Sequence, residues 1–166
     1  STLARKLGGV ILSTDDYLPD YEGLPEPERD LPERADLGRL HRNLTELRSG
    51  QRTNAPVWCF HEHRRTGERV VEPGALVVCE GIHALHASLT DLLDVRVYVD
   101  APAQVRWERW QAIETQSERG WGVERAKAFF DDVAEPTFHA RASAYRASAH
   151  VVVINDRTAS SQEPSG

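Results

Sequence analysis

The first candidates for chemistry are carboxylates that follow short apolar runs of the sequence. Asp15 and Asp16 come directly after the run 10–13, and Glu80 follows the run 75–79. An apolar run without alternation is typical of a strand that is buried on both faces of a parallel sheet. Ligands of such sheets bind beyond the carboxyl ends of the strands, where these carboxylates would emerge. One of the two adjacent aspartates could instead cap the turn that follows its strand.

The elements that must position these carboxylates indicate an α/β fold. The helix 36–49 is predicted by leucines at helical spacing, by Asp36 as its N-cap and by Gly50 as its stop. Buried strands that alternate with helices indicate a parallel sheet with helices on both faces. The expected strands are 10–13, 75–79, 95–99 and 151–154, and the expected helices are 1–7, 36–49, 83–93 and several between Pro102 and Ala149, with a boundary at Pro136.

Two further segments are candidates for substrate binding. The segment 18–32 is rich in proline, glutamate and aspartate, and it is too long for a passive connector. Residues 56–60 read as an extended segment, Thr66-Gly67 as a turn, and 68–71 as a returning strand. These patterns predict a lid or binding loop and a β-hairpin that stands off the main sheet.

The hairpin also carries a competing metal pattern. Cys59, His61 and His63 alternate, so on a strand all three would point to one face, and a thiolate with two imidazoles can bind zinc. No fourth ligand is evident nearby in the sequence. A zinc site is therefore the weaker of the two interpretations of this segment.

Composition and charge narrow the class of protein. The chain has 166 residues, 40% hydrophobic and 28% charged, which is typical of one domain with a real core. Its formal net charge of -6 argues against sequence-independent binding of nucleic acid. No apolar run approaches the length of a membrane span, about 20 residues, and no signal peptide is evident. The two cysteines lie in apolar segments and are expected to be free thiols, which fits the cytoplasm.

The order of these motifs resembles the uridine/cytidine kinase branch of the P-loop kinases, a group that includes phosphoribulokinase and pantothenate kinase. The resemblance extends from Ser1 to about Asp156. No single motif is specific to the family, but six motifs in this order and at this spacing are. The motifs are Ser1-Thr2-Leu3-Ala4, Ser13-Thr14-Asp15-Asp16-Tyr17, Asp30-Leu31-Pro32, Pro56–Phe60 with His63 and Arg65, Cys79-Glu80-Gly81-Ile82, and Arg106, Arg109 and Arg119-Gly120.

The resemblance implies transfer of the γ-phosphate of ATP to a hydroxyl of a nucleoside or similar small molecule. Asp15 would be the base that accepts the proton of the attacking 5'-hydroxyl. Ser1 and Thr2 would bind the donor phosphates, and Ser1 and Glu80 would hold Mg²⁺. The structural alternative for Glu80 is a simple strand-end carboxylate.

The resemblance also implies the acceptor site and the lid. Asp30 would hold the ribose hydroxyls, and the base would be contacted by Trp58, His63 and Arg65. The arginines of the lid, which would close over the transferring phosphate, are Arg106, Arg109 and Arg119. The structural alternatives are a core position for the tryptophan, and solvated positions for the aspartate and for the lid arginines.

The sequence departs from the family pattern at several positions. Trp58 and Cys59 stand where the family has tyrosine and aspartate, and Trp121 stands at the second arginine of the lid. The glycines and lysine of the phosphate-binding loop, and the strand before them, would have to precede Ser1. We therefore expect that the chain is part of a longer protein, with an N-terminally incomplete kinase domain over 1–156 and a disordered tail over 157–166.

These patterns leave two alternatives open. The altered hairpin allows a kinase for another small metabolite, and the altered lid together with the unseen Gly-Lys loop allows a nucleotide-binding module without catalysis. The expected partner is a small-molecule substrate, with no nucleic acid and no membrane, and a homo-oligomer is left open.

Overall fold

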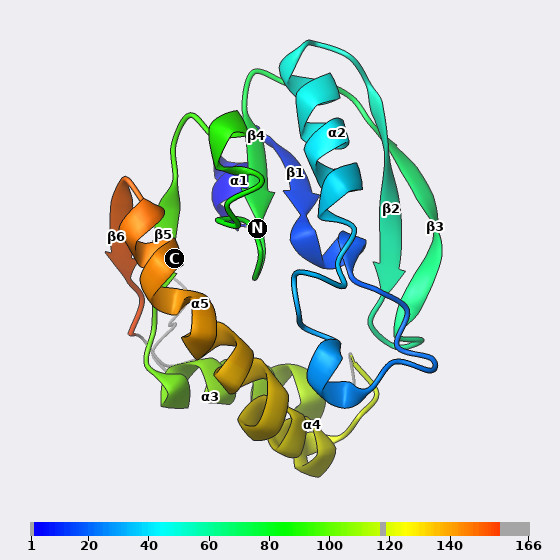
Figure 1. Ribbon diagram of the computed structural model, residues 1–166, viewed down its shortest axis with the longest axis vertical. Coiled ribbons are helices and arrows are strands. Elements are labelled where there is room, and N and C mark those ends of the chain that lie inside the picture. The colour runs from blue at the N-terminus through cyan, green and yellow to red at the C-terminus, as the bar shows by residue number, and fades with distance from the viewer. Residues whose placement is uncertain (1, 117–118, 157–166) are drawn as a thin grey trace, which may run out of the picture. The chain divides into compact units, whose positions relative to one another are not determined.

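The computed structural model describes residues 2–116 and 119–156, and of Thr2 and Leu3 it describes the backbone alone. The chain forms two compact units, Ser1–Asp94 and Val95–Gly166, which are described separately (Figure 1). The first unit contains α1 (Thr2–Lys6), β1 (Val10–Ser13), α2 (Leu37–Arg48), β2 (Thr53–Cys59), β3 (Arg64–Val71) and β4 (Val77–Glu80). The second contains β5 (Val97–Asp100), α3 (Ala103–Thr115), α4 (Val123–Phe129), a π-helical turn (Phe130–Ala134), α5 (Glu135–Ser148) and β6 (Val151–Ile154).

The parallel pair of β1 and β4 is the centre of the first unit. Its register places Val10 beside Val77 and Ser13 beside Glu80. Leu12 of β1 is fully buried in a core that it shares with the leucines of α2 and with residues of both hairpin strands. Figure 1 shows α2 between this pair and the β2–β3 hairpin. The expected strand 10–13 is confirmed with the same bounds.

Helix α2 forms as the sequence predicts. The Asp36 side chain accepts a hydrogen bond from the backbone N–H of Arg39 at 3.0 Å, which satisfies one of the free donors of the first turn. The helix ends at Arg48, and Gly50 follows with a left-handed φ of 78°. Leu40, which lies on the apolar face of the helix, is fully buried.

The hairpin reverses at a different place from the one expected. Strands β2 and β3 pair in antiparallel fashion, and the reversal occupies residues 60–63, where His63 takes a left-handed φ of 52°. The expected turn at Thr66-Gly67 is wrong. Val57 pairs with Gly67 and Trp58 pairs with Arg65, so Thr66 is the extra residue of a β-bulge. The glycine therefore marked an irregularity within a strand and no change of direction.

The helix expected over 83–93 does not form, and only the 3₁₀ turn Thr90–Leu92 is helical there. Two backbone N–H groups of this segment bond to side chains. The backbone N–H of His83 donates to the Thr14 hydroxyl at 3.3 Å, and that of Ser88 donates to the His86 ring at 3.3 Å. The His86 ring bonds to the backbone two residues away, and such local side-chain bonds stabilise turns at the expense of helix.

The second unit is built around the parallel pair of β5 and β6 and a helical region. The two strands pair from Val97 beside Val151 to Asp100 beside Ile154. Trp107 of α3 packs against Ala126 and Phe130, with Trp110 and Trp121 around them. Pro136 lies at the start of α5, as expected from its lack of an N–H donor.

The last strand is present but is not buried. The side chains of β6 are 37% to 60% exposed, although the strand was expected in the interior. The apolar run predicted the strand correctly. Burial on both faces depends in addition on neighbouring elements, and among the described residues of this unit β6 pairs only with β5.

Both cysteines, Cys59 and Cys79, are free, as expected, but they are half-buried and not fully buried. Among the residues that the structure describes, no helix is long and apolar enough to span a membrane. The expected tail 157–166 lies outside the described residues.

Candidate active site

The structure brings the two strand-end carboxylate motifs together. Since Ser13 and Glu80 are register partners, Asp15 and Glu80 emerge at the same edge of the β1–β4 pair. Gly81 touches the first motif directly, because a Cβ atom at this position would lie 2.2 Å from the Thr14 hydroxyl and 3.0 Å from Asp15 Oδ1. The Thr14 hydroxyl accepts from the backbone N–H of His83 and donates to Asp15 Oδ1 at 3.4 Å. The two motifs are therefore in contact through backbone and one buried hydroxyl.

The two adjacent aspartates differ in their contacts. Asp16 accepts a hydrogen bond from the backbone N–H of Trp58 at 3.3 Å and forms an ion pair with Arg69 at 3.5 Å. It therefore ties the hairpin to the end of β1. The turn after the strand is capped by the Ser13 hydroxyl, which accepts from the N–H of Asp15 at 3.4 Å, and not by an aspartate side chain. Asp15 is the member of the pair that faces Gly81 and the second motif.

Glu80 fits the role of a magnesium ligand. It is half-buried at the end of β4, and within residues 2–116 and 119–156 its carboxylate makes no hydrogen bond and no ion pair. Mg²⁺ prefers hard oxygen ligands and usually keeps several waters and substrate phosphates, so one or two protein carboxylates suffice. Ser1, the other expected ligand, lies outside the described residues, and the side chain of Thr2 is not described.

Tyr21 joins three of the residues expected to bind the substrate. Its ring stacks on the His63 ring, with centroids 5.6 Å apart and planes 10° apart, and it lies 5.1 Å from the Trp58 ring. Its hydroxyl donates to Asp30 Oδ1 at 3.4 Å, and its N–H donates to the His63 carbonyl at 3.0 Å. The expected substrate residues from the loop and from the hairpin therefore meet at one ring.

Tyr21 was missed by the sequence analysis. It lies in the segment 18–32, which has no periodicity from which the direction of a side chain could be read. The available signal was that Tyr21 is the only aromatic residue of that segment. Burial raises the pKa of Tyr21, and the negative charges of Asp30 and Asp15 raise it further. The hydroxyl therefore keeps its proton over a wider pH range than that of an ordinary tyrosine, and it donates this proton in its hydrogen bond to Asp30.

Trp58 and Arg65 have structural contacts as well as their expected roles. The Trp58 side chain is 5% exposed, which corresponds to the core alternative, and its contact with a base stays a prediction. The guanidinium of Arg65 donates to the carbonyls of Tyr17 and Leu18 at 3.2 and 3.3 Å and lies 3.5 Å from Asp36. Arg65 therefore holds the start of the loop, and its contact with a base stays a prediction.

The hairpin residues considered for zinc do not gather. His61 and His63 lie in the reversal 60–63, so the alternation expected of a strand does not apply to them. Across the part of the chain that the structure describes, no group of three or more histidine, cysteine, aspartate or glutamate side chains is placed to hold a metal ion.

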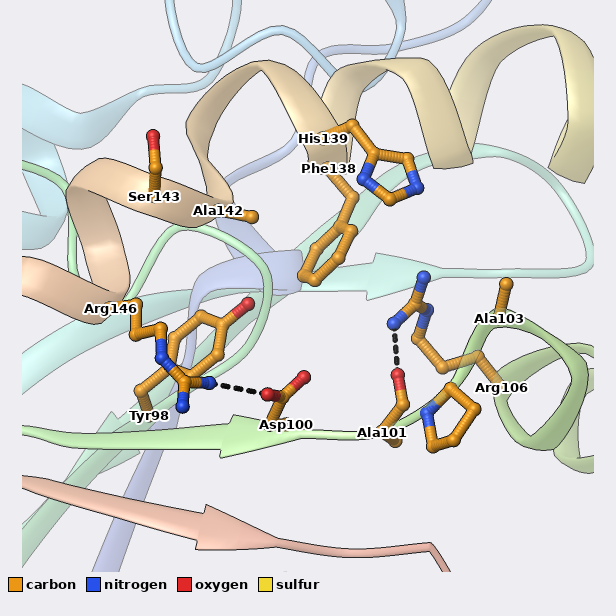
Figure 2. A pocket seen from close by; sticks show the side chains of 11 residues that line it. Tyr98, Asp100, Ala101, Ala103, Arg106, Phe138, His139, Ala142, Ser143 and Arg146 are labelled. Carbon is orange, nitrogen blue, oxygen red and sulfur yellow. Dashed lines mark hydrogen bonds and ion pairs between the residues drawn. The ribbon is translucent and has the colours of Figure 1, made fainter.

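The lid arginines lie in the second unit and contact different groups there. Arg106 forms an ion pair with Glu135, with Nε 2.9 Å from Oε1, and its guanidinium lies 4.1 Å from the centre of the Phe138 ring. Figure 2 shows it beside a pocket of about 340 Å³, where it also donates to the Ala101 carbonyl. Arg109 donates to Asn155 Oδ1 at 2.8 Å. Their three-residue spacing therefore does not bring both to one partner.

The third lid arginine has an aromatic neighbour. The Arg119 guanidinium lies 5.0 Å from the centre of the Trp110 ring, a distance at which a cation interacts favourably with the face of an indole. Its expected contact with a phosphate stays a prediction, as do those of Arg106 and Arg109.

The first unit contains a thiol whose ionisation opposes folding. Burial raises the pKa of the Cys79 thiol to about 12, and the charge of Glu80 contributes to the shift. Burial also raises the pKa of the Tyr17 hydroxyl. In the folded state these groups keep their protons at pH values where the unfolded chain releases them. Their contribution to stability is therefore complete below the unfolded-state pKa and is lost as the pH rises through the folded-state pKa.

We expect the free energy of unfolding to fall as the pH is raised from about 9 towards 12. Each shifted group contributes at most about 1.4 kcal/mol per pH unit. Urea unfolding at several pH values measures this slope, and Cys79→Ala is expected to make it shallower. An unchanged slope in Cys79→Ala would contradict the contribution of this thiol.

Comparisons with known proteins show the family of the chain. Residues 26–160 match the model of the "Phosphoribulokinase / Uridine kinase family". The chain is 32% identical over 134 residues to a uridine kinase of Staphylococcus haemolyticus, which covers 76% of this chain and 64% of the relative. The chain thus spans less than two thirds of the length of that relative.

Two solved structures share the fold. One is described as a possible uridine kinase from Bacillus stearothermophilus, with a TM-score of 0.54 and 16% identity over 92% of this chain and 77% of the other. The other is phosphoribulokinase from Rhodobacter spheroides, with a TM-score of 0.57 and 14% identity over 89% of this chain and 61% of the other. At these identities the comparison shows the α/β P-loop kinase fold.

Proposed function

The chain belongs to the phosphoribulokinase/uridine kinase family, and from this premise we propose that its protein transfers the γ-phosphate of ATP to a hydroxyl of a nucleoside. Uridine and cytidine are the first acceptors to consider, because the curated relatives that match include uridine kinases and a uridine-cytidine kinase. The observation that carries the proposal is the contact between the Asp15 and Glu80 motifs at the end of two parallel strands.

In this proposal Asp15 accepts the proton of the attacking hydroxyl. Phosphoryl transfer requires alignment of donor and acceptor more than covalent help, and a carboxylate near the nucleophile suits proton acceptance. Asp15 faces Gly81 and the Glu80 motif, whereas Asp16 binds the hairpin through Trp58 and Arg69, and this difference in position supports Asp15 as the base. Mg²⁺, when bound, would neutralise the charge of the donor phosphates, and Glu80 would help to hold it together with Ser1.

Asp30 and His63 would fix the acceptor. Asp30 can accept hydrogen bonds from ribose hydroxyls, and the Tyr21 hydroxyl, 3.4 Å away, orients its carboxylate. The His63 ring, stacked on Tyr21, would meet the polar edge of the base. Arg106, Arg109 and Arg119 would bind the transferring phosphate, and Ser1 and Thr2 the donor phosphates.

A second acceptor class is supported by the hairpin. Trp58 and Cys59 stand where the resemblance implies tyrosine and aspartate, so recognition of a pyrimidine base has lost two of its expected groups. The same machinery would then phosphorylate a hydroxyl of another small metabolite, with the sheet-end carboxylates in unchanged roles.

The proposal is tested by ATP consumption in the natural full-length protein. Uridine and cytidine are compared with pantothenate and with sugar phosphates, and the phosphorylated product is identified by mass spectrometry. We expect turnover that depends on ATP, on Mg²⁺ and on one of these acceptors. Binding of ATP without transfer to any acceptor would instead indicate a nucleotide-binding module.

Tyr21→Phe is expected to raise the acceptor KM by about fivefold to tenfold with a smaller effect on kcat. The change removes the hydrogen bond to Asp30, which is worth about 1 kcal/mol or somewhat more to a charged acceptor, and it keeps the ring that stacks on His63. Steady-state kinetics with the preferred acceptor measures the effect. Unchanged KM in Tyr21→Phe, with a loss in Asp30→Asn, would show that Asp30 acts without this support.

A further inference from the structure

A second pocket of the first unit lies outside the proposed active site. It has a volume of about 310 Å³ and is formed by one face of α2 and by the start of β2. Arg39, Arg42 and Glu46 contribute from the helix, and Arg52 and Thr53 contribute from the strand side. None of these residues is among those assigned to ATP, Mg²⁺ or the acceptor. The pocket is therefore a separate feature that the proposed reaction does not use.

The lining is positively charged in an acidic chain. It contains three arginines and one glutamate, whereas the whole chain has a formal net charge of -6. Arg39 is already engaged, because its Nη2 donates to the Asn54 carbonyl at 3.0 Å and pairs with Glu68 at 2.6 Å. Arg42 and Arg52 are exposed, and neither makes a hydrogen bond or an ion pair within the described ranges 2–116 and 119–156. Two guanidinium groups thus keep their donors for a ligand.

The side chains at the floor of the pocket are buried and form hydrogen bonds with one another. Asn43 and Thr53 are 6% and 3% exposed, and Asn43 Nδ2 donates to the Thr53 hydroxyl at 2.5 Å. The Thr53 hydroxyl in turn donates to the Glu46 carboxylate. The one negative charge of the lining is therefore turned towards the floor. The Tyr17 hydroxyl donates to Asn43 Oδ1 at 2.8 Å, which fixes the floor from the opposite side.

We propose that this pocket binds a small multivalent anion of the phosphate class, either a polyphosphate or a phosphate monoester. A guanidinium presents donors in a planar fork that matches phosphate oxygens, and two such groups with unused donors lie on one pocket. A volume near 310 Å³ is at the small end of ligand pockets and suits a phosphorylated fragment. The acidic balance of the chain disfavours a nucleic acid as the ligand.

The test measures the reaction of individual arginines with phenylglyoxal in the natural full-length protein, with and without pyrophosphate or glycerol phosphate. Peptide mass spectrometry follows Arg42 and Arg52, and Arg48 is the internal control because it is exposed on the same helix but outside the pocket. At ten times the dissociation constant of the anion, the two pocket arginines should react about tenfold more slowly, with Arg48 unchanged.

The outcome does not depend on kinase activity, because mass spectrometry measures the modification of each arginine separately. Protection by pyrophosphate alone assigns a polyphosphate, and protection by glycerol phosphate assigns a monoester. Equal rates for Arg42 and Arg52 with and without both anions would overturn the proposal, as would equal protection of Arg48. In calorimetry with a saturating non-hydrolysable ATP analogue, Arg42→Gln/Arg52→Gln should bind the anion about tenfold or more weakly, and Arg48→Gln should not.

Discussion

Asp15→Asn is expected to lower kcat by about 10² to 10⁴-fold, the usual contribution of a general base, while the protein remains folded. The amide keeps the shape of the side chain and its position beside Thr14 and Gly81, but it cannot accept a proton. The measurement is steady-state turnover of the full-length protein with its preferred acceptor, together with a thermal unfolding curve.

Asp16→Asn is the matched control, because it makes the same chemical change one residue away. Asp16 binds the N–H of Trp58 and pairs with Arg69, so its replacement should weaken the attachment of the hairpin and lower the unfolding temperature. Its kcat should fall much less than that of Asp15→Asn. Full turnover in Asp15→Asn would remove Asp15 as the base.

Gly81→Ala is expected to destabilise the protein by about 3 to 5 kcal/mol. Gly81 has a φ of 120°, which a residue with a side chain rarely adopts, and its Cβ would lie 2.2 Å from the Thr14 hydroxyl. Thr14 is fully buried and its hydroxyl is one bond from Cβ, so it cannot swing aside. Urea unfolding of the variant and of the unchanged protein measures the difference.

Gly50→Ala separates the two causes of the loss in stability at Gly81, which are the strained backbone conformation and the steric clash of the new Cβ atom. Gly50 also has a positive φ, of 78°, but a Cβ there would meet no atom within 4 Å. Its replacement should cost about 1 to 2 kcal/mol, which is the backbone contribution alone. If Gly81→Ala and Gly50→Ala were equally destabilising, the close approach of Gly81 to Thr14 would not matter for stability.

Local patterns predicted the elements that position the carboxylates. The run 10–13 and the capped leucine helix 36–49 formed as expected. In both, the local preference of the residues for strand or helix agrees with the side on which their apolar residues are packed. The meeting of Asp15 and Glu80 also followed from sequence, since parallel strands end at one edge of their sheet.

The errors arose where distant contacts decide local structure. The segment 83–93 had an adequate helical pattern, but its start is held by Thr14, 69 residues earlier, and inside it the His86 ring bonds to the backbone of Ser88. The hairpin reversal depends on the left-handed φ of His63, which glycine signals did not indicate. Tyr21 was missed for a related reason, because its partners Asp30 and His63 come from two different segments.

The register of β1 with β4 has a consequence for how such a protein can diversify. The spacing of Asp15 and Glu80 is fixed by backbone pairing and by the close contact of Gly81, so substitution of neighbouring side chains changes it little. The residues around Tyr21 belong to a loop and a hairpin outside that pair of strands. Under the proposed function, evolution can therefore exchange the acceptor by altering the loop and the hairpin, while the apparatus for phosphoryl transfer is inherited intact.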